Sequence, residues 1–281
     1  MKSAVWVRPF RIGFSAVFLG AVYAALAGLV ILATRLAVTR PPEALPGISA
    51  VLFPWQGLAM IVAAVIIGGV FVRRMRSRMA WELILGTTLF LGVWFYLWVA
   101  FSGEVGLVAA SVLTLLQAWA RRVWIHDVFI LLGAAGVALN FSFLFEIKIL
   151  LLLLVGMAVY DTFAGRPGGV SARFAASLIH RGVIPGVVVP GKWSELGLPM
   201  TDAVRRADTV FLGAGDLILP LLLAARASVV SPLWGLIVGA GIVVAAAWLG
   251  SRGPTKPFPA LVPLVIGSGV PYLILSLFRF V

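Results

Sequence analysis

The sequence predicts an all-α membrane protein that crosses the bilayer several times. Of its 281 residues, 62% are hydrophobic and only 11% are charged, whereas about a quarter of the residues in a soluble domain are charged. The hydrophobic residues form long runs, and several runs reach the ~20 residues that a helix needs to cross a bilayer. Lys and Arg gather in short clusters between these runs, as is typical of the loops of membrane proteins.

Nine apolar segments are predicted to span the membrane, and we expect one membrane domain over residues 1–281. The predicted spans are Ile12–Ala33, Ile48–Val72, Trp81–Phe101, Val105–Ala120, Val128–Phe145, Ile147–Phe163, Thr209–Ala225, Val229–Leu249 and Pro259–Phe278. Spans one to six fall within residues 1–163, a loop covers 164–208, and spans seven to nine fall within 209–281. The first run exceeds the ~7–15 apolar residues of a cleaved signal peptide, so we expect it to be retained as a span.

The basic residues predict the orientation of these spans. When the connections are assigned to alternate sides, 17 of the 22 Lys and Arg residues fall on the side of the N-terminus and five on the other. Without the loop 164–208 the balance is still 11 to five. Because Lys and Arg accumulate on the cytoplasmic side, we expect the N-terminus to be cytoplasmic and the C-terminus to lie outside.

The composition excludes several functions. The net charge of +12 could suggest a nucleic-acid partner, but its distribution among membrane loops argues against one. The chain has no cysteine, and its two histidines, His126 and His180, fall outside the predicted spans. No zinc-binding motif and no membrane-embedded Ser–His arrangement is present, so we expect no metal and no cofactor.

The loop 164–208 is the longest predicted connection, and a loop of this length is usually functional or disordered. Within it, Ser171–His180 has an apolar face and nearby arginines, which predicts a short helix at the membrane interface. Val187–Val189, between Pro185 and Pro190, are strand-forming residues. The loop offers this segment no obvious strand partner, and a plain surface connection is the alternative interpretation.

Two carboxylates stand out among the ten acidic residues because only Asp161 and Asp216 lie well inside predicted spans. A charged group at that depth costs at least ~2.5–3.5 kcal/mol, so its default interpretation is functional. At 1.5 Å per helical residue, Asp161 lies roughly 8 Å from Arg166, and Asp216 roughly 12 Å from Asp208. Their helices flank the same loop, so the two carboxylates can meet at similar depth. A helix–helix hydrogen bond is the structural alternative.

The residues around Asp216 predict an irregular, accessible helix. Gly213 and Gly215 carry no side chain, which lets a neighbouring helix or an extended peptide approach closely. Pro220, four residues after Asp216, has no N–H, so the backbone carbonyl of Asp216 loses its helical hydrogen bond. We therefore expect a bent or loosened helix at this carboxylate.

Three short motifs resemble the signatures of the GxGD intramembrane aspartyl proteases, in the presenilin and signal peptide peptidase group. They are Tyr160-Asp161, Gly213-Ala214-Gly215-Asp216 and Pro259-Ala260-Leu261, in this order along the chain. The resemblance implies that Asp161 and Asp216 are catalytic. It also implies that Tyr160, Gly213, Gly215, Pro259, Ala260 and Leu261 shape the active site or bind substrate. The predicted orientation favours the presenilin branch, and the short loop between the aspartates favours a compact, archaeal-type microbial homologue.

This resemblance implies an endopeptidase that hydrolyses peptide bonds within transmembrane segments by a two-aspartate mechanism with an activated water. Its partners would be transmembrane-helix proteins and the lipid bilayer, in the cell membrane if the source is prokaryotic. An unwound substrate needs backbone hydrogen-bond partners, which Val187–Val189 or the region near Pro259 could supply. The alternative is a proton-coupled transporter or ion leak channel that uses the same two aspartates as a relay. The oligomeric state is not predicted.

Overall fold

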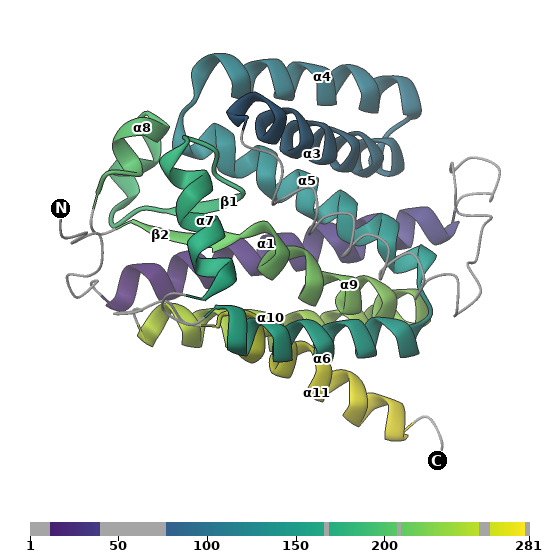
Figure 1. Ribbon diagram of the computed structural model, residues 1–281. Coiled ribbons are helices and arrows are strands. Elements are labelled where there is room, and N and C mark those ends of the chain that lie inside the picture. Colours follow the sequence, from purple (N-terminus) through teal and green to yellow (C-terminus); the bar gives the residue numbers. More distant parts are fainter. Residues whose placement is uncertain (1–11, 40–76, 166–168, 207–208, 253–258, 279–281) are drawn as a thin grey trace.

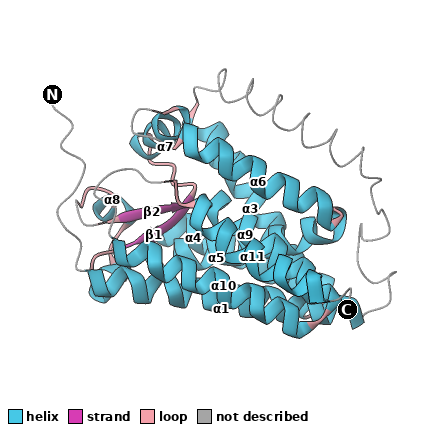
Figure 2. Ribbon diagram, turned by 90° about the horizontal axis from the view of Figure 1, so that it is seen from below, coloured by secondary structure: helices cyan, strands magenta, loops and turns pink. Residues whose placement is uncertain are grey.

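The computed structural model describes residues 12–39, 77–165, 169–206, 209–252 and 259–278. Within these ranges the chain is a layered bundle of long helices with a small sheet at one end (Figures 1 and 2). The long helices are α1 (Ile12–Thr39), α3 (Arg78–Ala100), α4 (Gly103–Ala120), α5 (Val123–Leu144), α6 (Ile147–Ala164), α9 (Ala214–Val230), α10 (Pro232–Arg252) and α11 (Leu261–Phe278).

These eight helices coincide with eight of the nine predicted spans. The remaining prediction, Ile48–Val72, lies outside the described residues. Six of the eight are long and apolar enough to cross a bilayer. The other two are α9, which has 17 residues, and α11, whose apolar part is Leu261–Leu277. The chain is therefore a multi-pass membrane protein.

The core of the bundle lies where α5 packs between α3 and α9, while α1 packs along α10 and α9 (Figure 1). Small residues permit the closest helix approach. A Cβ atom added to Gly136 of α5 would overlap the carbonyl oxygen of Gly92 of α3. Two backbones can come this close only where neither helix carries a side chain.

The loop predicted over 164–208 folds against one end of the bundle. It contains α7 (Val170–His180), β1 (Gly186–Val189), a short 3₁₀ helix (Trp193–Gly197) and α8 (Met200–Ala203), and it leads to β2 (Val210–Gly213). The short helix predicted over Ser171–His180 is therefore present as α7, and the predicted strand over Val187–Val189 is present as β1. The plain surface connection is wrong for this segment, because β1 is buried along its whole length.

The partner of β1 is a strand that the sequence did not reveal. β1 and β2 are antiparallel, with Gly186 opposite Gly213 and Val188 opposite Phe211. The predicted start of the seventh span at Thr209 is therefore wrong, because the helix begins at Ala214. Asp216 lies in the first turn of α9 and not two turns inside a helix. Val210 and Leu212 satisfy their backbone groups by pairing with β1.

The fifth span also begins earlier than predicted, at Val123 and not at Val128. The added turn contains His126 and Asp127, which are both buried. Their predicted position outside the helix is wrong. Each of these polar side chains reaches β1. Oδ1 of Asp127 has its hydrogen-bond partner there, whereas its buried Oδ2 has none among the described residues.

The helix ends that were predicted to share the side of the N-terminus also meet at one end of the bundle. Trp193 packs edge-on against Phe14 and Phe18 near the start of α1, with ring centroids 5.1 and 5.6 Å apart. Arg122, at the start of α5, forms an isolated β-bridge with Pro199. The starts of α1 and α5 therefore lie against the long loop.

Candidate active site

Asp161 and Asp216 line the same cavity, which residues of β1 and β2 also line. Asp161 lies three residues before the end of α6, and Asp216 lies in the first turn of α9. The two carboxylates are close enough to interact electrostatically. The structure thus brings together the two acidic residues that the sequence singled out.

Asp216 is held by the turn in which it lies. Gly213 is the N-cap of α9, and Asp216 is the third residue of the helix. Its carboxylate turns back and accepts a hydrogen bond from the backbone N–H of Gly213. This is the reciprocal half of a capping box, in which the third residue satisfies the backbone donor of the N-cap. The motif Gly213–Asp216 is therefore a helix start that fixes its own carboxylate.

Asp161 is held by a different helix. Its Oδ2 accepts a hydrogen bond of 3.2 Å from the backbone N–H of Leu261, the first residue of α11. A helix N-terminus is a favourable environment for a carboxylate, because its first N–H groups have no partner within the helix. Ala260 and Leu261 line the cavity, whereas Pro259 precedes them and is not among the lining residues.

The carboxylate of Asp161 also needs the absence of a side chain at Gly165. A Cβ atom there would lie 2.8 Å from Oδ1 of Asp161, closer than real Cβ atoms approach other heavy atoms. Tyr160, next to Asp161, lines the same cavity, and its phenol oxygen accepts a 3.4 Å hydrogen bond from Ser171 of α7. The end of α6 is thereby joined to α7.

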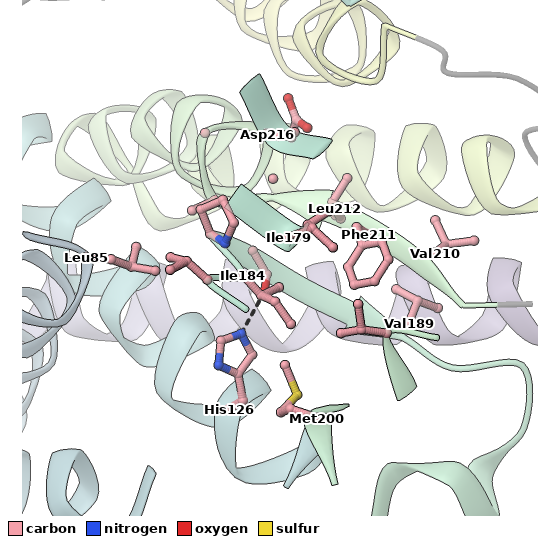
Figure 3. Close-up of a pocket in the computed structure, with 18 of the residues that line it drawn as sticks. Leu85, His126, Ile179, Ile184, Val189, Met200, Val210, Phe211, Leu212 and Asp216 are labelled. Carbon is pink, nitrogen blue, oxygen red and sulfur yellow. Dashed lines mark hydrogen bonds between the residues drawn. The ribbon is translucent and has the colours of Figure 1, made fainter. Parts of the chain in front are cut away.

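Helix α5 closes the outer edge of β1. Oδ1 of Asp127 accepts a 2.9 Å hydrogen bond from the backbone N–H of Val188. Nε2 of His126 lies 3.0 Å from the carbonyl oxygen of Gly186. A dashed line marks this hydrogen bond in Figure 3. With β2 on its other side, β1 has both edges occupied. The predicted use of Val187–Val189 as a free backbone edge is therefore wrong.

The outer edge of β2 is the one that faces the cavity. Because the N–H of Val188 points away from β2, Val188 and Phe211 form a non-hydrogen-bonded pair, and the N–H and C=O of Phe211 point away from β1. Within the described part of the chain, no hydrogen bond uses the Phe211 N–H. Figure 3 shows Val210, Phe211 and Leu212 along the cavity, with Asp216 just beyond the strand.

Sequence reasoning missed His126, Asp127 and Phe211 as residues that build this site. Asp127 follows two arginines at a predicted span boundary, so it has the pattern of an ordinary loop residue. Phe211 lies inside an apolar run that fits a helix as well as a strand. The three valines Val187–Val189 predict a strand, but not the location of its partners.

We expect Asp127→Ala to lower the thermal stability of the protein. The substitution leaves the buried N–H of Val188 without an acceptor, which costs about 1–3 kcal/mol, and each kcal/mol lowers Tm by roughly 2–4 °C in a chain of this size. Asp127→Asn keeps an acceptor oxygen and should be milder. Thermal unfolding in detergent measures both. Equal Tm values for the alanine and asparagine variants would contradict the proposed role of the Val188 hydrogen bond.

The cavity has a volume of about 2320 Å³, larger than the ~300–1,000 Å³ typical of small-molecule sites. Its lining includes the carboxylates, the outer edge of β2, one face of α7, the start of α3 and the end of α4. Among the described residues, no group of three or more His, Cys, Asp or Glu side chains could hold a metal ion. These dimensions suit a segment of polypeptide.

Comparison with known proteins places this geometry in a known fold. No protein-family model and no curated protein matches the sequence. The solved structures that match the fold include two that are each described as a presenilin family intramembrane aspartate protease. The one in space group C222 has a TM-score of 0.55 and 20% identity, and the match covers 94% of this chain and 98% of that one. The one in space group P2 has a TM-score of 0.53 and 22% identity, over 91% and 96% of the two chains.

The chain therefore has the fold of presenilin-family intramembrane aspartate proteases, over nearly its whole length and that of the matched structures. This is the fold that the resemblance of the three motifs implied. The cavity with two aspartates lies at the end of the bundle that carries the loop between them.

Proposed function

We propose that this protein is an intramembrane aspartyl endopeptidase of the GxGD type, which hydrolyses peptide bonds within transmembrane segments. The observation that carries the proposal is the placement of Asp161 and Asp216 on one cavity, each held by a backbone N–H at a helix start. The likeness to the fold of presenilin-family proteases supports the same assignment.

The proposed chemistry uses the two carboxylates in opposite protonation states. The ionised one takes a proton from water, and the resulting oxygen nucleophile attacks the carbonyl carbon of the substrate. The protonated one donates a hydrogen bond to the carbonyl oxygen, which carries the developing negative charge. Proton transfer to the amide nitrogen then releases the amine product as the C–N bond breaks. Neither role is assigned to one particular aspartate, because two closely coupled acids titrate together as a pair.

A transmembrane substrate must unwind before this reaction, since a helical backbone hides its carbonyl groups. The unwound segment then has unpaired N–H and C=O groups where water is scarce. We propose that it pairs with the outer edge of β2, at Phe211, as an added strand. The pairing would place substrate backbone directly beside Asp216, which follows β2 by three residues.

We also propose nine spans, with a cytoplasmic N-terminus and the C-terminus outside. Eight described helices support the count, and the excess of Lys and Arg on one side supports the orientation. The sheet and cavity would then face the cytoplasmic half of the membrane.

The two glycines of the Gly213–Asp216 motif should respond differently to substitution. A Cβ atom on Gly213 would lie 3.2 Å from Oδ2 of Asp216, whereas one on Gly215 meets no atom within 4 Å. We expect Gly213→Ala to displace the carboxylate and to lower kcat about tenfold. Gly215→Ala should fold normally and keep kcat. Peptide cleavage kinetics compare the two variants, and an equal loss of kcat would contradict this assignment.

The decisive experiment incubates the purified protein with a transmembrane peptide, with and without a transition-state-mimicking aspartyl protease inhibitor. We expect cleavage within the apolar part of the peptide and its loss when the inhibitor is present. Proton flux is measured in parallel across liposomes that contain the protein. An intact peptide combined with flux that requires both aspartates would favour the transporter alternative and reject the protease.

A further inference from the structure

The backbone carbonyl of Asp216 has an unusual hydrogen-bond partner. In a regular helix it would accept from the N–H of residue 220, but Pro220 has no N–H. Helix α9 nevertheless continues through Pro220 to Val230. The missing donor comes from another helix, because the phenol group of Tyr23 in α1 donates to this carbonyl at 2.9 Å.

Tyr23 suits this role because it is itself fully buried, with 0% of its surface exposed. A buried phenol O–H needs an acceptor, and a buried carbonyl needs a donor. The carbonyl cannot donate, so the direction of the bond is fixed. One bond thus satisfies the buried hydroxyl group of Tyr23 and the carbonyl group of Asp216, which lacks its regular helical donor.

We propose that Tyr23 is a positioning residue for Asp216, an inference that rests on the proposed proteolytic function. Asp216 is held at two points: Gly213 N–H binds its carboxylate, and the Tyr23 hydroxyl fixes its peptide carbonyl. Asp161 shows the ordinary arrangement for comparison, since Gly165 N–H donates to its carbonyl at 2.8 Å. The carbonyl of Asp161 is thus bound by a backbone N–H four residues later, whereas the carbonyl of Asp216 is bound by the Tyr23 side chain from another helix.

This arrangement leaves the Asp216 carbonyl without the backbone hydrogen bond that residue 220 would supply in a regular helix. The carbonyl is bound by a side chain on a separate helix, so the orientation of the peptide group after Asp216 depends on how α1 packs against α9. A shift of this peptide group would move the carboxylate relative to Asp161. The substitution Tyr23→Phe removes the restraint and leaves the packing of the ring in place.

The test is a double-mutant cycle of Tyr23→Phe and Pro220→Ala, measured for both stability and cleavage. Pro220→Ala introduces a backbone N–H that can serve the Asp216 carbonyl in place of Tyr23. With Pro220 present, we expect Tyr23→Phe to lower Tm by several degrees and kcat about tenfold, with little change in KM. In the Pro220→Ala background the same change should lower kcat less than threefold and Tm by less than half as much. Tyr96→Phe, at a buried tyrosine of α3, is the matched control and should leave kcat unchanged.

The measurements of Tm and kcat distinguish a failure of the positioning role from a failure of the proposed proteolytic function. Equal effects of Tyr23→Phe in both backgrounds would overturn the hydrogen-bond role. Coupling in Tm with an unchanged kcat would overturn the positioning role and leave the proteolytic function intact. A wild-type protein that cleaves no peptide would overturn the proposed function and the positioning role with it, even where the Tm values are coupled. Coupling in both Tm and kcat would support the proposal.

Discussion

Replacing either Asp161 or Asp216 by asparagine should abolish peptide cleavage. The mechanism requires one carboxylate to accept a proton from water and the other to donate to the substrate carbonyl. The amide of asparagine can neither take up a proton as a base nor give one up as an acid. Asparagine keeps an oxygen that can accept from Leu261 N–H or from Gly213 N–H, so the local hydrogen bonds can persist. We expect the folded bundle to remain, because loss of a charge in an apolar setting does not destabilise it.

Cleavage of a transmembrane peptide, followed by mass spectrometry, measures this loss, and thermal unfolding verifies the fold of each variant. Asp202→Asn is the matched control, because Asp202 is an exposed carboxylate on α8, away from the dyad. It should cleave at the wild-type rate. Substantial cleavage by a folded Asp161→Asn or Asp216→Asn variant would remove that residue from the catalytic pair.

Phe211→Pro should reduce cleavage about tenfold or more, a factor equivalent to ~1.4 kcal/mol. Proline removes the N–H that points from β2 into the cavity and leaves the hydrogen bonds between β1 and β2 in place, since those use Val210 and Leu212. Proline is tolerated on an edge strand where its N–H side faces away from the sheet. A substrate strand would then lack one of its backbone partners.

The control for this experiment is Phe211→Ala, which keeps the N–H and removes the same packing of the ring against the cluster around Val188. We expect its cleavage rate to fall much less than that of the proline variant. Equal losses in the two variants, measured at matched stability, would show that the side chain matters and that backbone pairing at Phe211 does not.

The helices could be predicted from the sequence because each span is a long apolar run bounded by charges. The two aspartates could be predicted because a carboxylate inside such a run is costly and is seldom kept without a function. The end of the bundle was harder to predict. Val210–Leu212 is apolar and adjoins α9, so the run from Thr209 fits one continuous helix, and only the pairing with β1 reveals a strand.

Apart from the approach of Asp161 to Asp216, the contacts between distant segments could not be predicted. Pro220 indicates that the Asp216 carbonyl lacks a donor, but nothing in the sequence points to Tyr23, 193 positions earlier. His126 and Asp127 lie about 60 positions before the strand that they contact. A sequence shows the periodicity and composition of each segment. It does not show which helices pack against each other, and that packing determines these hydrogen-bond partners.

The contact of Asp127 and His126 with β1 has a consequence for assembly. A two-stranded sheet with both edges open could recruit strands on either side, and an exposed edge is a template for aggregation with other chains. Here one edge is covered by side chains of the same molecule. The sheet can therefore grow in one direction only, and in the proposed complex it would accept a single guest strand, which sets a stoichiometry of one substrate per protease molecule.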